Sequence, residues 1–138
     1  MGPTMDDQIF KITKDKERAR DLIVMAEERL EDIPSSSKDK PYKIIEEYYE
    51  IIKELLTAVM YLDGYKTLSH KKLIEYFGNN YALLDDYQLK IIDTLRKFRN
   101  DIVYYGKKIS IDFLVNNEED IKKIISILLK ITQKNLKK

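Results

Sequence analysis

Two arginines, an asparagine and a tyrosine recur at helical spacing in one segment: Arg96, Arg99, Asn100 and Tyr104. A helix turns by about 100° per residue. With Ile91 as the origin, Arg99, Arg96, Asn100 and Tyr104 then follow round one flank at about 80°, 140°, 180° and 220°. Guanidinium and amide groups in such an array can form several directed hydrogen bonds. The spacing therefore predicts a second contact surface, either a partner interface or a pocket.

The same flank also carries the apolar residues Leu89, Ile92 and Val103. An ordinary solvated helix face is polar, so this flank is expected to be covered. We interpret the three residues as a homodimer interface, unless another helix of the same chain covers them. A separate core stripe is predicted within about 40° of one line, and it consists of Ile91, Leu95, Phe98, Ile102 and Tyr105.

Arg96-x-x-Arg99-Asn100-x-x-x-Tyr104, followed by Tyr105-Gly106, resembles the signature helix of the HEPN family (higher eukaryotes and prokaryotes nucleotide-binding domains). That family has an arginine, a polar residue that is often asparagine, and a histidine four to six positions after the arginine. Tyr104 stands at the histidine position here. The opening helix, a tyrosine-rich second helix, the Ser69-His70-Lys71 junction and the closing helix are also similar to archaeal and bacterial members.

The resemblance implies a composite site formed where two signature helices meet in a dimer. Arg99 would contact a phosphate, and Asn100 would orient groups in the site. The family histidine moves protons during attack by a ribose 2′-hydroxyl, and a phenol such as Tyr104, with a pKa near 10, is a poor base at neutral pH. The resemblance also implies a minimal nucleotidyltransferase as a partner, as in toxin–antitoxin systems.

Three functions remain open at this point. The preferred one is a catalytically degenerate HEPN-like homodimer that binds nucleotide, RNA or a nucleotidyltransferase. The second is a weak or altered metal-independent endoribonuclease in which Tyr104, Tyr105 or His70 transfers protons. The third is a structural homodimer without a ligand. The predicted ligand-binding residues are Arg96, Arg99, Asn100, Tyr104 and Lys107, and the only catalytic candidates among them are Arg99, Asn100 and Tyr104.

Composition excludes several kinds of site. The chain of 138 residues has no cysteine and one histidine, so cysteine-based and multi-histidine metal sites are excluded. We expect no metal and no cofactor. The 25 basic and 24 acidic residues nearly cancel, so nucleic-acid binding would need a local patch. No apolar stretch is long enough to span a bilayer. We expect a cytoplasmic protein, and the Ile, Lys and Glu content is compatible with a thermophilic source.

Two sets of polar residues receive a structural interpretation. Glu46, Glu47 and Glu50 lie at helical spacing but lack the Glu-x-x-His pairs of a di-iron bundle, so they are interpreted as a solvated acidic face. His70 is expected in the first turn of a helix, where the macrodipole disfavours the charged imidazole. We interpret it as a packing or capping residue rather than a catalytic base.

The pattern predicts four main helices and one short one. The first runs from residue 5 or 6 to residue 32, and the second runs from 41 to 63 and ends at Gly64. A short helix is expected over 70–77, and the signature helix begins after Asp85 and ends at Gly106. Residues 109–115 are interpreted as a connector or a single turn, and the last helix begins after Asn117.

We therefore predict an all-α fold, an antiparallel four-helix up-and-down bundle with an additional short helix. Residues 1–138 are expected to form one domain. Residues 1–5 are interpreted as a disordered segment or an expression remnant, and residues 134–138 as a frayed tail.

Overall fold

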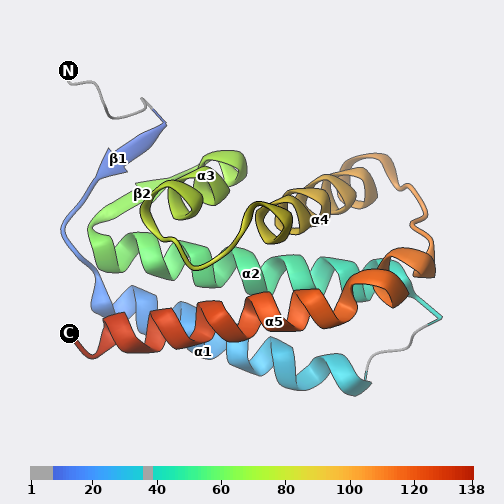
Figure 1. Cartoon of the computed structure of the whole chain (residues 1–138), viewed down its shortest axis with the longest axis horizontal. Coiled ribbons are helices and arrows are strands. Elements are labelled where there is room, and N and C mark those ends of the chain that lie inside the picture. The colour runs from blue at the N-terminus through green and yellow to red at the C-terminus, as the bar shows by residue number, and fades with distance from the viewer. Residues whose placement is uncertain (1–7, 36–38) are drawn as a thin grey trace.

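The computed structural model describes residues 8–35 and 39–138, and in these the chain forms five α-helices and one two-stranded sheet (Figure 1). The elements are β1 (Ile9–Lys11), α1 (Lys16–Asp32), the 3₁₀ turn η1 (Ile33–Ser35), α2 (Pro41–Asp63), β2 (Tyr65–Thr67), α3 (His70–Asn80), α4 (Asp86–Tyr105) and α5 (Ile111–Leu136).

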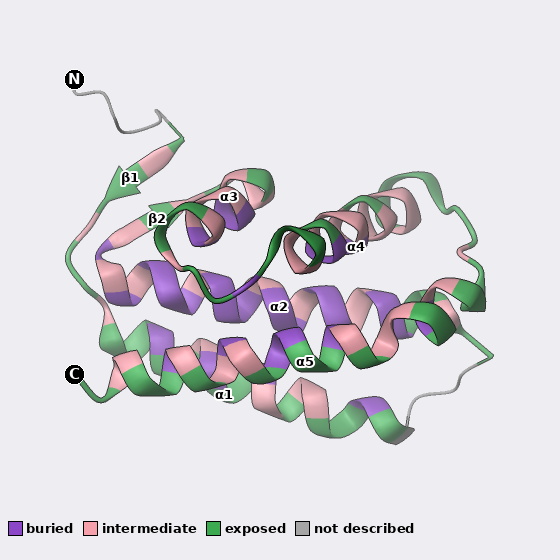
Figure 2. Cartoon of the chain, viewed as in Figure 1, coloured by how far each residue is buried: buried purple, intermediate pink, exposed green. Residues whose placement is uncertain are grey.

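Helix α2 lies at the centre of the bundle. Helices α1, α2, α4 and α5 alternate in direction, and α3 lies beside α4 over the same side of α2 (Figure 1). The residues of α2 are buried on more than one side, whereas each outer helix buries one side (Figure 2). The predicted all-α bundle with an additional short helix is confirmed.

Local signals account for the bounds of α2 and α4. Pro41 opens α2, and Gly64 ends it with a left-handed φ of 90°. Asp85 and Gln88 form a capping box at the start of α4, in which the Gln88 N–H donates to Asp85 Oδ1 over 2.7 Å. Gly106, with φ 61°, ends this helix. These helix bounds were predicted correctly, and the capping box and Gly106 fix where α4 begins and ends.

The predicted first helix is wrong for residues 9–15, and its proposed start at residue 5 or 6 lies outside the described residues, as do residues 1–5. The Asp15 side chain caps α1 by accepting from the Arg18 N–H over 3.0 Å, so the helix begins at Lys16. The preceding segment pairs with β2 in an antiparallel register of Ile9 with Thr67. The Ile12 N–H also donates to the Gly64 carbonyl over 2.9 Å.

Helices α3 and α5 are also longer than predicted. Helix α3 continues through Gly78 to Asn80. Helix α5 begins at Ile111, because Ser110 caps it by accepting from the Asp112 N–H over 3.1 Å. In its first turn the Phe113 ring makes an edge contact with Phe98, with centroids 4.8 Å apart. Helix α5 then continues to Leu136, into the segment expected to fray.

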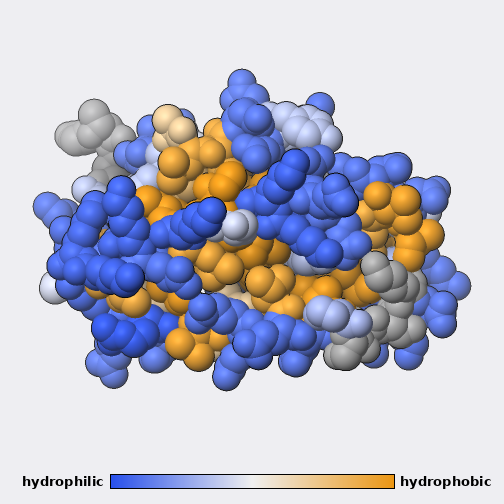
Figure 3. All heavy atoms as spheres, turned by 60° about the horizontal axis from the view of Figure 1, so that its bottom comes forward, coloured by the Kyte–Doolittle hydropathy of each residue, from blue (hydrophilic) through white to orange (hydrophobic). Residues whose placement is uncertain are grey.

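One apolar groove lies away from the signature helix. It has a volume of about 700 Å³ and lies between the end of α1, the start of α2 and α5. Hydrophobic atoms with hydrophilic margins are visible on this face of the molecule (Figure 3). The Tyr48 hydroxyl, which donates to Glu118 over 2.7 Å, lines the groove with Leu30, Ile33, Ile125 and Leu129.

Candidate functional site

The flank of α4 that carries the motif is covered in part by other helices of the same chain. Ile92 is fully buried in the core. Leu89 is half-buried against α3: a Cβ at Gly78 would lie 3.1 Å from Leu89 Cδ1. Of the three predicted dimer-interface residues, only Val103 is largely exposed, with 48% of its surface accessible. The prediction was wrong for Ile92, because its side chain is already buried within one chain.

The core stripe of α4 is shorter than predicted. Ile91 and Leu95 are buried, and Phe98 and Ile102 pack partly buried against the core. Tyr105 is 73% exposed and does not belong to the core. It is the last residue of α4, directly before Gly106.

A carboxylate lies beside each of Arg96 and Arg99. Arg96 Nε lies 2.8 Å from Asp93 Oδ1, and the Arg96 side chain is 16% exposed. Arg99 Nη2 lies 3.7 Å from Glu50 Oε1 of helix α2, and the Arg99 side chain is 19% exposed. Arg99 Nη1 also makes a long hydrogen bond of 3.5 Å to Asn100 Oδ1. Both guanidinium groups are therefore partly buried but remain accessible from one side.

Glu50 connects Arg99 with a further cation. Its second oxygen, Oε2, lies 2.7 Å from Lys53 Nζ on the same helix. The Glu50 carboxylate thus lies between Lys53 and Arg99. Both ion pairs are partly shielded from water, since the Glu50 side chain is only 22% exposed. The interpretation of Glu50 as part of a solvated acidic face was wrong. The same interpretation was also wrong for Glu47, whose Oε1 accepts a hydrogen bond from Arg29 Nη1.

His70 lies next to this group. The Ser69 hydroxyl caps α3 by accepting from the Lys72 N–H over 3.2 Å, which places His70 in the first turn. The His70 ring lies 5.8 Å from that of the buried Tyr49. Burial lowers the pKa of His70 below its ordinary value of 6.5, and the charges of Lys53, Arg99 and Arg96 lower it further, while Glu50 opposes them. The shift favours the neutral imidazole.

We call Glu50, Lys53, His70, Arg96 and Arg99 the Arg96–Arg99 cluster. Burial raises the pKa of Tyr49, whose ring lies against His70, and the charges of Arg96 and Arg99 oppose that shift. The three cations of the cluster face the carboxylates Glu50 and Asp93, and Lys97 also lies 3.3 Å from Asp93, so positive charge is in excess. The cluster can thus bind a single anionic group through charge-assisted hydrogen bonds.

The remaining predicted ligand residues lie at the end of α4. Tyr104 is 68% exposed, and within the described residues it forms no hydrogen bond with Arg99 or Asn100. Lys107 is exposed as well, with Nζ 5.9 Å from the centroid of the Tyr105 ring. The structure therefore divides the predicted site into the cluster and a separate, solvated group of aromatic and basic side chains.

The sequence did not indicate that Lys53 and Glu50 belong to the site, or that His70 lies beside the arginines. These residues come from α2 and α3, and no local spacing connects them with α4. The one available signal was that His70 is the only histidine of the chain. Across residues 8–35 and 39–138, no group of three or more acidic or histidine side chains could hold a metal ion.

Comparison with protein-family models, with curated proteins and with solved structures gives no match. The HEPN resemblance therefore rests on the sequence pattern and stays a prediction. In the described part of the chain, each helix is too short or too polar to cross a lipid bilayer.

Proposed function

We propose that this chain is a HEPN-like protein that binds the phosphate of an RNA or a nucleotide at the Arg96–Arg99 cluster. The supporting observation is the position of two arginines beside Lys53 and His70, with positive charge in excess of the nearby carboxylates. A partly buried guanidinium interacts with phosphate more strongly than a solvated one, because water screens the charges less.

The geometry of Arg99 supports a ligand role more than a structural one. A guanidinium has five N–H donors, and the contacts of Arg99 to Glu50 and Asn100 are both long, at 3.7 and 3.5 Å. A phosphate oxygen near Arg99 would replace weak contacts with shorter ones. The homodimer and a nucleotidyltransferase partner belong to the proposal by resemblance, while the cluster itself is assembled within one chain.

The test is binding of a labelled RNA oligomer, measured by fluorescence anisotropy. Arg99→Ala should weaken binding about tenfold to a hundredfold, because a hydrogen bond to a charged group contributes about 1.5–3 kcal/mol. Lys90→Ala is the matched control, since Lys90 lies on the same helix but is exposed. Equal losses in both variants, or no loss in Arg99→Ala, would reject the cluster as the binding site.

A weak or altered ribonuclease is the second candidate, and the position of His70 favours it. A neutral imidazole beside two arginines can accept a proton from a ribose 2′-hydroxyl whose phosphate the arginines hold. End-labelled RNA should then be cleaved by the native protein and not by Arg99→Ala or His70→Gln. Cleavage only after Tyr104→His would instead indicate a site without its proton carrier.

A homodimer without a ligand makes a different prediction. Arg99→Ala or Asn100→Ala would lower the stability of the dimer and leave no RNA affinity to lose. Light scattering of the native protein tests the dimer directly, and a monomer over the whole accessible concentration range would reject that part of the proposal.

A further inference from the structure

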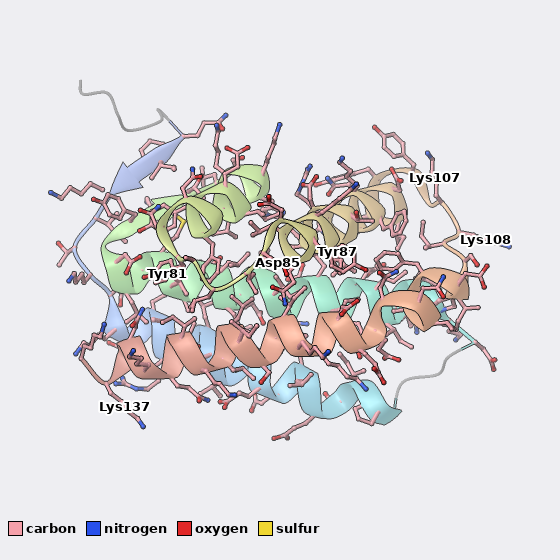
Figure 4. The ribbon with its side chains drawn as sticks, viewed as in Figure 1. Tyr81, Asp85, Tyr87, Lys107, Lys108 and Lys137 are labelled. Atoms are coloured by element: carbon pink, nitrogen blue, oxygen red, sulfur yellow. The ribbon has the colours of Figure 1, made fainter. Side chains whose placement is uncertain are left out.

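The end of α4 exposes aromatic and basic side chains together. Tyr105 is 73% exposed, and its ring is 5.9 Å from Lys107 Nζ. Lys107 and Lys108 follow Gly106 and lie at this end of the molecule (Figure 4). Tyr42, in the first turn of α2, is 39% exposed. We call Tyr42, Tyr105, Lys107 and Lys108 the tyrosine–lysine patch.

Three members of the patch border one hollow. A pocket with a volume of about 520 Å³ is lined by Tyr42, Lys107 and Lys108 together with apolar atoms of Ile102 and Ile109. This volume lies within the usual range for small-molecule sites. The wall thus combines an aromatic ring, aliphatic side chains and two cations. Asp39 also lines the pocket, but the two lysines leave a positive charge in excess.

The turn at Gly106 creates this arrangement. With φ at 61°, Gly106 reverses the chain, and the Lys107 N–H donates to the Asp101 carbonyl over 3.2 Å. A Cβ at Gly106 would meet no atom of the described residues within 4 Å, so the space on that side of the turn is open. Lysines after a helix also compensate its dipole. The helix dipole does not explain why the Tyr105 ring beside these lysines is exposed to water.

The chemistry of the patch matches an unpaired nucleotide. Exposed aromatic rings bind single-stranded RNA by stacking on its bases, and lysines contact the adjacent phosphates. In an A-form duplex the bases are stacked on each other and unavailable for such contacts. We propose that the tyrosine–lysine patch holds an unpaired base and its phosphate, so that the RNA bound by this protein is single-stranded. This inference rests on the proposed function of the cluster.

The position of the patch is consistent with one continuous strand of RNA. Tyr105 lies six residues after Arg99, which is about 9 Å along the helix axis. Tyr104, four residues after Asn100, lies on the same side of α4 as Asn100. A few nucleotides therefore suffice to reach from the cluster to the patch, past the exposed side chains of Val103 and Tyr104.

The experiment compares one labelled RNA oligomer alone and annealed to its complement, with anisotropy as the readout. The native protein should bind the single strand more tightly. Tyr105→Ala should weaken single-strand binding about fivefold to a hundredfold, the range for loss of one base–aromatic stack. Tyr105→Phe should retain it, because the ring remains. Tyr87→Ala is the matched control, since Tyr87 is 58% exposed near the start of α4 (Figure 4).

Several results would overturn the inference. These are equal affinity of the native protein for single strand and duplex, equal losses in Tyr105→Ala and Tyr87→Ala, or no RNA binding at all. A shift from dimer to monomer in Tyr105→Ala, seen by light scattering, would assign the patch to a protein interface instead. Loss of binding in Arg99→Ala without loss in Tyr105→Ala rejects the patch alone. The reverse result rejects the proposed role of the cluster and retains the patch.

Discussion

Two arginines contact neighbouring carboxylates of helix α2 in different ways. Arg29 of α1 donates to Glu47 over 2.6 Å and to both oxygens of Glu54 over 3.2 Å. Arg99 of α4 approaches Glu50 only to 3.7 Å. Arg29 therefore has its donors occupied by two carboxylates, whereas Arg99 shares one carboxylate with a lysine. The difference separates a contact that joins α1 to α2 from one that leaves donors available for a ligand.

Removal of Arg29 should have the largest effect on stability. Glu54 is buried, with 4% of its surface exposed, so Arg29→Ala leaves a buried carboxylate without its cation. We expect the free energy of unfolding to fall by about 3 kcal/mol at pH 7. Arg99→Ala should cost less than about 1 kcal/mol, because Glu50 retains Lys53. Urea denaturation measures both, and Arg20→Ala on the exposed side of α1 is a control.

The pH dependence of that loss follows from Glu54. Burial raises the pKa of Glu54 above its ordinary value of 4.5, and Arg29 opposes the shift. The ionised form is therefore costly in the folded state, and this cost appears as the pH rises from 4.5 through the raised pKa. Arg29→Ala should thus destabilise more at pH 7 than at pH 4. A loss that does not change with pH would show that Arg29 acts by packing alone.

Removal of the negative charge at Glu50 should raise the RNA affinity of the cluster. Glu50→Gln frees Arg99 and Lys53 and adds one positive charge at the site. RNA affinity should rise about twofold to fivefold, the equivalent of one partly exposed ion pair. Glu46→Gln, one helical turn before Glu50 on α2, gives the same change of net charge at a residue outside the cluster. Equal gains in the two variants would show an effect of net charge only.

The titration of His70 is the smallest and most local effect. Its pKa should lie below 6.5, and Arg99→Ala should raise it, because a neighbouring positive charge is removed. Proton NMR can follow the single imidazole. Since the folded state binds fewer protons below pH 6.5 than the unfolded state, the free energy of unfolding should fall as the pH drops through this range. An unchanged pKa in Arg99→Ala would separate His70 from the cluster.

Local signals made most of the fold predictable. Pro41, Gly64, Asp85 with Gln88, and Gly106 act on the residues next to them, and each marks a helix end that the structure has. The N-terminal segment was predicted wrongly because its hydrogen bonds join distant parts of the chain, such as Ile12 with Gly64. Its apolar residues fit helical spacing, so periodicity alone could not exclude a helix there.

The candidate site was predictable only in part. The two arginines and Asn100 lie on one helix, so their common face followed from the rotation per residue. The contacts of Arg99 with Glu50 and the nearness of His70 depend on how α2 and α3 pack against α4. The position of Ile92 on the flank was also predicted, but the burial of its side chain by other parts of the chain was not.

Gly64 has a consequence for the order of folding. It ends α2 and also accepts the N–H of Ile12, with so little space that a Cβ there would lie 3.2 Å from the Ile12 oxygen. The β1–β2 ribbon pairs Ile9 with Thr67, a contact between residues far apart in the chain, whereas α1 and α2 are joined by a short connection. Since contacts that close long loops form late, the ribbon is expected to form after the α1–α2 hairpin. Weakening it should speed unfolding and leave the folding rate nearly unchanged.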